Sequence, residues 1–290
     1  MFRIAKSLAV LVVVAFAFGV RPADASGADP IRVALLTAEA AAQAASADAA
    51  LATAESQMRD ATEQARRGQA AVLEGEDDPT VPLEAAGVGF EDAATPFGQA
   101  RAELAHLGWT LRALDPQAIP PTLEMEPSDM AAIGGQWRAA APTCAILASL
   151  RLQAEATLEA LDDALAALDA DDPAAALEAI DAAARHIDQV RAYTDSLATL
   201  GFWVDTVDGL IDAGRDIALA AQAGDAAALA EAQARYQVAA ADAGRADQAL
   251  AIALGEAAAE ATGPASSSSA DALRAVAAVR DQLAGLSILR

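Results

Sequence analysis

Two apolar stripes separated by an acidic turn constrain the fold of this chain more than any other feature. Residues 143–168 and residues 177–197 each place apolar side chains at steps of three, four or seven, which puts each set on one face of a helix. Between them, Asp172 can cap a first-turn amide, and Pro173 has no amide to leave unpaired. The pattern predicts two antiparallel helices that bury their apolar faces against each other. The stripe residues are Leu147, Ala154, Leu158, Leu161, Leu165 and Leu168 in the first helix, and Leu177, Ile180, Ala184, Ile187, Val190, Thr194 and Leu197 in the second.

A weaker echo of this turn occurs later in the chain. Residues 218–230 resemble residues 164–177 with one position removed, and both read as a helix, a tight acidic turn and a helix. The echo indicates either a helical repeat or reuse of a common helix-turn-helix solution, and we favour reuse because the spacing occurs only twice.

Residues 31–71 carry a heptad pattern that is built mainly of alanine. Its core positions are Thr37, Ala44, Leu51, Met58, Ala65 and Val72, with Ala40, Ala47, Ala54 and Ala61 at the second heptad position. Such a stripe is typical of a self-associating coiled coil or of one long helix in an intramolecular bundle, and we favour the bundle.

Alanine also decides the fold class. Hydrophobic residues make up 54% of the chain but aromatic residues only 4%, and alanine is the best helix former and a poor strand former. We therefore predict an all-α fold, an elongated antiparallel helical bundle with long alanine-rich helices.

The segments between the stripes complete the predicted organisation. Residues 74–97 hold prolines, glycines and acids and read as a loop before a short helix at 99–114. Pro142 is expected to end a brief helix at 128–140, and a break is expected near Gly201 with a turn at Gly224. The predicted parts are 1–25, a signal peptide; 26–115, a long helix, acidic loop and short helix; 116–142, a Pro-rich link; 143–262, a helical hairpin bundle; and 263–290, a Ser-rich linker and a helix at 271–289.

The first 25 residues resemble an export signal. Arg3 and Lys6 precede an apolar core at 8–20, and Ala23 and Ala25 form a small-x-small cleavage site. The core is short for a membrane span, so we predict cleavage and a periplasmic, cell-surface or secreted protein, with an uncleaved anchor as the alternative. No later segment reads as a membrane span.

The net charge of −23 disfavours nucleic acid and anionic membranes as partners. The acidity fits a saline habitat, but the absence of asparagine and the near absence of lysine fit a GC-rich genome more simply.

The residues that common catalytic motifs need are scarce. The chain has one cysteine and two histidines, and its only lysine lies in the predicted signal, which excludes Walker loops, Schiff-base chemistry and Cys-rich zinc sites. Glu103 and His106 form a single Glu-x-x-His pair, the weak candidate for a metal site, without the second copy that di-iron bundles use. Cys144 is expected to be a small buried residue and His186 a polar edge of the helix interface. We predict no enzyme, no cofactor and no catalytic residue.

Two functions fit these features. The first is an exported scaffold or adaptor that binds a protein partner, or itself, through helices. The alternative is a sensing or capture domain for a small ligand or cation, with a pocket near Trp109, Trp137, Phe202 or Trp203.

Overall fold

The all-α prediction is confirmed. A computed structural model describes residues 30–74, 78–194 and 198–286, and within these residues the secondary structure is helical, without strands. The described helices are α2 (Pro30–Glu74), α3 (Thr80–Leu114), α4 (Pro127–Asp169), α5 (Pro173–Arg191), α6 (Ala198–Ala223) and α7 (Ala226–Gly285). The predicted signal peptide lies outside the described residues.

Helix α2 follows the alanine heptads closely. All ten predicted core positions, from Thr37 to Val72, are buried within the single chain. Pro30 is the first helical residue, where its missing amide costs nothing. The interpretation as a bundle helix is therefore confirmed, and this stripe offers no free surface for a second chain.

Helix α3 corrects the predicted loop at 74–97, because it already begins at Thr80. Asp78 accepts a hydrogen bond from the Thr80 amide at 2.9 Å, and Pro82 lies in the first turn, where no intrahelical donor is needed. Pro96 lies inside the helix, where a proline costs about 3 kcal/mol of stability. Burial of the neighbouring Ala93 and Phe97 outweighs this cost. The buried positions recur every three or four residues: Leu83, Ala86, Phe90, Ala93, Phe97, Ala100, Leu104, Leu107 and Leu111.

Two glycines in α3 mark close helix contacts rather than a loop. A Cβ atom on Gly87 would lie 2.8 Å from the carbonyl oxygen of Gly134 in α4, and one on Gly89 would lie 2.8 Å from Cβ of Ala61 in α2. Only glycine allows backbones to approach this closely.

The Pro-rich link is shorter than predicted, because only residues 115–126 lie outside helices. Helix α4 starts at Pro127 and continues through Pro142, so the predicted break there is wrong. Ala140, Ala141 and Cys144 are buried around the proline, and this packing holds the helix together.

The predicted turn at Asp172 is confirmed. Asp171 has a positive φ of 59°, and the Asp172 carboxylate accepts a hydrogen bond from the Ala175 amide at 3.0 Å. Gly224 and Asp225 repeat this arrangement between α6 and α7, with φ of 66° at Gly224 and the Asp225 carboxylate 3.1 Å from the Ala228 amide. The sequence echo thus corresponds to two equivalent turns.

The second arm of the predicted hairpin is shorter than expected. Helix α5 ends at Arg191, ahead of Gly201, which itself lies inside α6. Its buried face includes Ile180, Ile187 and Val190 as predicted, but Ala176 and Ala183 replace the neighbouring Leu177 and Ala184. Leu197 lies outside the described residues.

Helix α7 corrects the predicted Ser-rich linker, since it is continuous through residues 263–269. Ser269 is buried, donates to the Ala265 carbonyl at 2.7 Å and accepts the Trp137 indole N–H at 3.0 Å. Burial of Ala265 and Ser269 outweighs the weak helix propensity of the serines.

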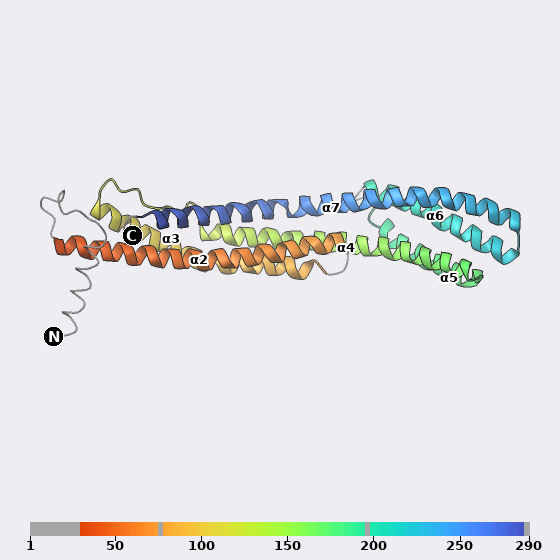
Figure 1. Cartoon of the computed structure of the whole chain (residues 1–290), viewed down its shortest axis with the longest axis horizontal. Helices are drawn as coiled ribbons and strands as arrows, with labels where there is room; N and C mark the ends of the chain where they lie inside the picture. The colour runs from red at the N-terminus through yellow and green to blue at the C-terminus, as the bar shows by residue number, and fades with distance from the viewer. Residues whose placement is uncertain (1–29, 75–77, 195–197, 287–290) are drawn as a thin grey trace. The chain divides into compact units, whose positions relative to one another are not determined.

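The helices form two compact units. The first contains residues 30–65, 84–138 and 264–286, where α2, α3, α4 and α7 run side by side (Figure 1). Polar contacts join these helices in turn. Thr110 of α3 contacts Gln43 of α2 at 2.9 Å, and Arg138 of α4 pairs with Glu91 of α3. Trp137 of α4 contacts Ser269 of α7 at 3.0 Å, and Arg280 of α7 contacts Asp48 of α2 at 2.8 Å.

The second unit contains residues 66–83 and 139–263. It contains α5, α6 and parts of α4 and α7, together with the end of α2 and the start of α3. Its polar contacts join His186 to Gln153 at 2.8 Å, Arg215 to Asp181 at 3.1 Å, Arg235 to Asp216 at 3.0 Å, and Arg151 to Asp247 at 3.6 Å. None of the described helices combines the length and apolar character needed to cross a bilayer.

Candidate interaction groove

The weak metal candidates stay apart from other potential ligands. Glu103 is half-buried on α3, and His106 is exposed one turn later. Among the described residues, no group of three histidine, cysteine or acidic side chains is placed to hold a metal ion. Within the described part of the chain, Glu103 and His106 are therefore not joined by a third ligand.

The four aromatic residues proposed to line a pocket do not gather. Trp137 and Trp203 are buried core residues, whereas Trp109 is 76% and Phe202 56% exposed. Trp109 and Trp137 belong to the first unit, and Phe202 and Trp203 to the second. Of the four positions, Phe202 alone lines the groove described below, and the other three do not line it.

Cys144 and His186 take the structural positions predicted for them. Cys144 is buried, and burial raises the pKa of its thiol, which disfavours the reactive thiolate. His186 is half-buried at the contact of α5 with α4, where its Nδ1 lies 2.8 Å from Oε1 of Gln153.

A groove in the second unit is the best candidate for a functional surface. It lies between α6 and α7 and has a volume of about 820 Å³. Phe202, Asp205, Thr206 and Gly209 line it from α6; Glu231, Ala234, Arg235, Val238, Ala239, Asp242 and Arg245 line it from α7.

The helical period explains why these side chains share one groove. On α6, Phe202, Thr206 and Gly209 follow each other at steps of four and three, while the adjacent Trp203 and Val207 point into the core. On α7, Ala234 and Val238 are also four apart. Each helix thus has an inner stripe that packs within the unit and an outer stripe that lines the groove.

The floor of the groove is small and apolar. A side chain at Gly209 would meet no atom within 4 Å, and Ala234 and Ala239 add only methyl groups. Phe202 and Val238 project beside this floor with 56% and 65% of their surfaces exposed. Large apolar side chains that border an unfilled hollow are typical of interaction sites.

The charges at the groove leave a negative excess. Arg235 forms an ion pair with Asp216 at 3.0 Å, and Arg245 forms one with Asp242. Asp205 and Glu231 are exposed and have no ion-pair partner among the described residues. Two carboxylates are therefore free to pair with cations of a ligand.

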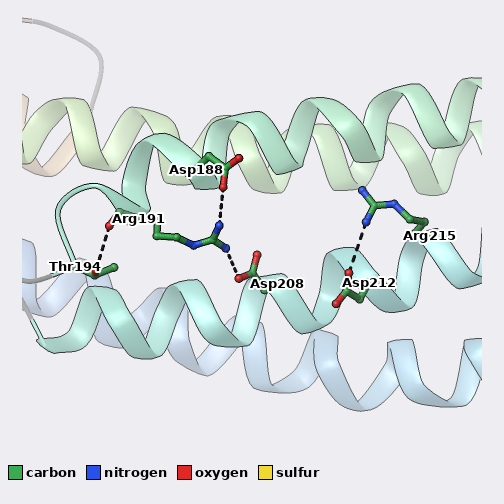
Figure 2. A network of polar contacts seen from close by, with 6 residues as sticks. All are labelled: Asp188, Arg191, Thr194, Asp208, Asp212 and Arg215. Carbon is green, nitrogen blue, oxygen red and sulfur yellow. Dashed lines mark hydrogen bonds and ion pairs between the residues drawn. The ribbon is translucent and has the colours of Figure 1, made fainter.

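A network of ion pairs joins α6, which lines the groove, to α5. Figure 2 shows Arg191 of α5 between Asp188, at 2.6 Å, and Asp208 of α6. Arg215 of α6 lies 3.1 Å from Asp181 of α5. It also lies 3.6 Å from Asp212, as Figure 2 shows for this pair. Exposed pairs contribute little singly, about 0–1 kcal/mol each, but together they fix α6 against α5.

A second hollow, between α2 and α7 in the first unit, has its central charge satisfied internally. Arg280 lies 2.8 Å from Asp48 and 2.5 Å from Glu55, and the hydrogen bond to Asp48 is the main cause that raises the Arg280 pKa. Since both partners are carboxylates of α2, this cluster joins two helices and leaves no free cation for a ligand.

The sequence pointed to Phe202 as one position near a pocket but did not predict the residues of α7 that line the groove with it. The sequence did offer one signal: residues 230–249 contain no large apolar side chains apart from Tyr236 and Val238, so the outer face of α7 has few side chains that could fill a hollow.

Comparison with protein-family models, curated proteins and solved structures finds no match to this chain.

Proposed function

We propose that this protein is a non-enzymatic helical scaffold or adaptor that binds a partner helix in the groove between α6 and α7. The observation that carries the proposal is the exposed pair Phe202 and Val238 beside a floor of glycine and alanine. A helix docks on such a surface by placing apolar residues from successive turns into the hollow. The export pattern in residues 1–25 of the sequence supports a role outside the cytoplasm.

The size of the groove fits a short helix. On α7 the lining runs from Glu231 to Arg245, which at 1.5 Å per residue corresponds to about 21 Å, or about four helical turns. An interface of this length is small, so we expect reversible binding with a Kd of about 1 μM or weaker.

Gly209 offers a direct test, because a larger side chain there fills the groove without a clash. Gly209→Leu should keep the fold and abolish partner binding. Gly244→Leu is the matched control, since Gly244 is also an exposed glycine with open space but does not line the groove.

The assay is site-specific photocrosslinking in the host cell with a benzophenone amino acid at Val238. We expect a polypeptide adduct whose crosslinked segment has the apolar period of a helix. The adduct should disappear with Gly209→Leu, persist with Gly244→Leu and be absent when the probe is moved to Ile252, an exposed α7 residue outside the groove.

Equal adducts from Val238 and Ile252, or an adduct that Gly209→Leu leaves unchanged, would rule out the groove as the binding site. Native mass spectrometry of the purified protein tests the alternative function. An additional small-molecule mass on the monomer would favour ligand capture over helix binding.

A further inference from the structure

We propose that the helix bound in the α6–α7 groove is basic and amphipathic, with two cationic side chains that flank its apolar stripe. This inference rests on the proposed function and specifies its partner. It starts from the two carboxylates at the groove, Asp205 and Glu231, which have no ion-pair partner among the described residues.

The register of α6 and α7 places these carboxylates at opposite ends of the groove. The contact of Asp216 with Arg235 at 3.0 Å sets the antiparallel alignment, in which Asp205 lies level with the region of Arg245. Glu231 lies about fourteen residues away along α7, which corresponds to about 21 Å.

The same alignment places the floor of the groove between the two charges. Gly209 lies level with Asp242, and Ala239, Val238 and Ala234 follow on α7 toward Glu231, whereas Phe202 lies about one turn beyond Asp205. A ligand that satisfies every part of the site therefore has a cation, a central apolar stripe and a second cation.

An α-helix meets these requirements with a defined spacing. Residues eleven or fourteen apart lie on nearly the same helix face and about 16 or 21 Å apart. Arginine or lysine at such positions, with leucine-type residues at steps of three and four between them, would pair with Asp205 and Glu231 while the apolar residues fill the floor.

Charge also argues against a second copy of this chain as the occupant. Each chain has a net charge of −23, and bringing two copies together places like charges next to each other. The groove itself has an excess of negative charge, so a cationic partner gains attraction both at the site and over a longer range.

The probes for the test are two fluorescein-labelled helical peptides of about eighteen residues, close to the length that the groove accommodates. Both have the same leucine stripe. One carries arginine at two positions fourteen apart, and the other carries glutamate at those positions. Fluorescence anisotropy with the full chain measures each Kd at low and at high salt.

We expect the arginine peptide to bind at least about tenfold tighter than the glutamate peptide at low salt, and the difference to shrink as salt screens the charges. The double variant Asp205→Asn, Glu231→Gln should weaken the arginine peptide by about three- to tenfold, because exposed pairs contribute modestly. Asp163→Asn with Glu178→Gln changes the net charge equally at two exposed acids outside the groove and should leave the affinity unchanged.

Two further variants separate this inference from the proposed function. Phe202→Ala should weaken both peptides, by about tenfold or more for the arginine peptide, whereas Ile252→Ala, at a similarly exposed residue outside the groove, should not. Far-UV circular dichroism verifies that each variant remains folded.

Equal binding of the two peptides, still sensitive to Phe202→Ala, would overturn the charge inference and leave the groove as a helix site. Binding that ignores both Phe202→Ala and Gly209→Leu, or no binding of either peptide up to about 1 mM, would overturn the proposed function as well. Sedimentation that shows a dimer sensitive to Gly209→Leu would identify a second copy as the occupant and refute the basic-helix inference.

Discussion

Adjacent glycines in α4 should respond to the same substitution with opposite signs. A Cβ atom on Gly134 would lie 2.5 Å from the carbonyl oxygen of Gly87 in α3, whereas one on Gly135 would meet no atom within 4 Å. Gly134→Ala therefore tests the close contact of α3 and α4, and Gly135→Ala controls for helix propensity.

The magnitude follows from the geometry. An ordinary contact begins at 3.4 Å, so the 2.5 Å approach requires α3 and α4 to separate locally by about 0.9 Å. A gap of that size forfeits about a quarter to a half of the dispersion attraction of the atoms around it, and overpacking of a core costs about 1–3 kcal/mol. Because the obstacle is a backbone oxygen that cannot rotate away, we expect the upper part of this range.

Both substitutions gain up to about 1 kcal/mol from replacing a mid-helix glycine. Gly135→Ala should therefore raise the free energy of unfolding by about 1 kcal/mol, and Gly134→Ala should lower it by about 1–2 kcal/mol. Urea unfolding followed by circular dichroism measures the difference, and native-state hydrogen exchange on α3 and α4 peptides localises it. If Gly134→Ala is as stabilising as Gly135→Ala, the close contact of these helices is wrong.

Three further predictions concern single contacts. Ser269→Ala should lower the free energy of unfolding by about 1–3 kcal/mol, measured by urea unfolding, because the buried Trp137 N–H loses its acceptor. Asp225→Ala should lower the thermal midpoint through the loss of about 1 kcal/mol of N-cap energy at the start of α7. Arg101→Gln should flatten the loss of stability with acid, measured by unfolding from neutral pH to below pH 4.5, because the hydrogen bond from Arg101 holds the Glu126 pKa below its usual 4.5.

The direction in which acid changes the stability follows because protonation of Glu126 is coupled to unfolding. A carboxyl whose pKa is lowered in the folded state contributes stability above its unfolded pKa, and this contribution is lost as the pH falls through the folded pKa.

Unchanged stability in Ser269→Ala would mean that the Trp137 indole finds another acceptor. A thermal midpoint that Asp225→Ala leaves in place would show that the cap at this turn is not needed, and an unaltered acid limb in Arg101→Gln would show that the Glu126 pair does not contribute.

The sequence alone determined the helical class, the long alanine helix and the hairpin turn at Asp172. These features depend on local chemistry: heptad spacing, the helix propensity of alanine, and a capping carboxylate followed by proline all act within one or two turns. All ten predicted core positions of α2 are buried for that reason.

Only the tertiary structure decided where helices continue through weak local signals. Gly87 and Gly89 read as loop residues, yet each provides a close contact with another helix. Pro142 and the serines before Ser269 read as breaks, yet the helix continues through them because neighbouring residues such as Ala141, Cys144 and Ala265 are buried.

The candidate groove likewise depends on tertiary structure. Phe202 and Val238 lie 36 positions apart in the sequence, and only the antiparallel register of α6 and α7 brings them to one hollow. A sequence pattern shows which face of a helix is apolar, but whether a second helix covers that face is decided by the packing of the whole unit. Here packing uses the inner stripes of α6 and α7 and leaves the outer ones open.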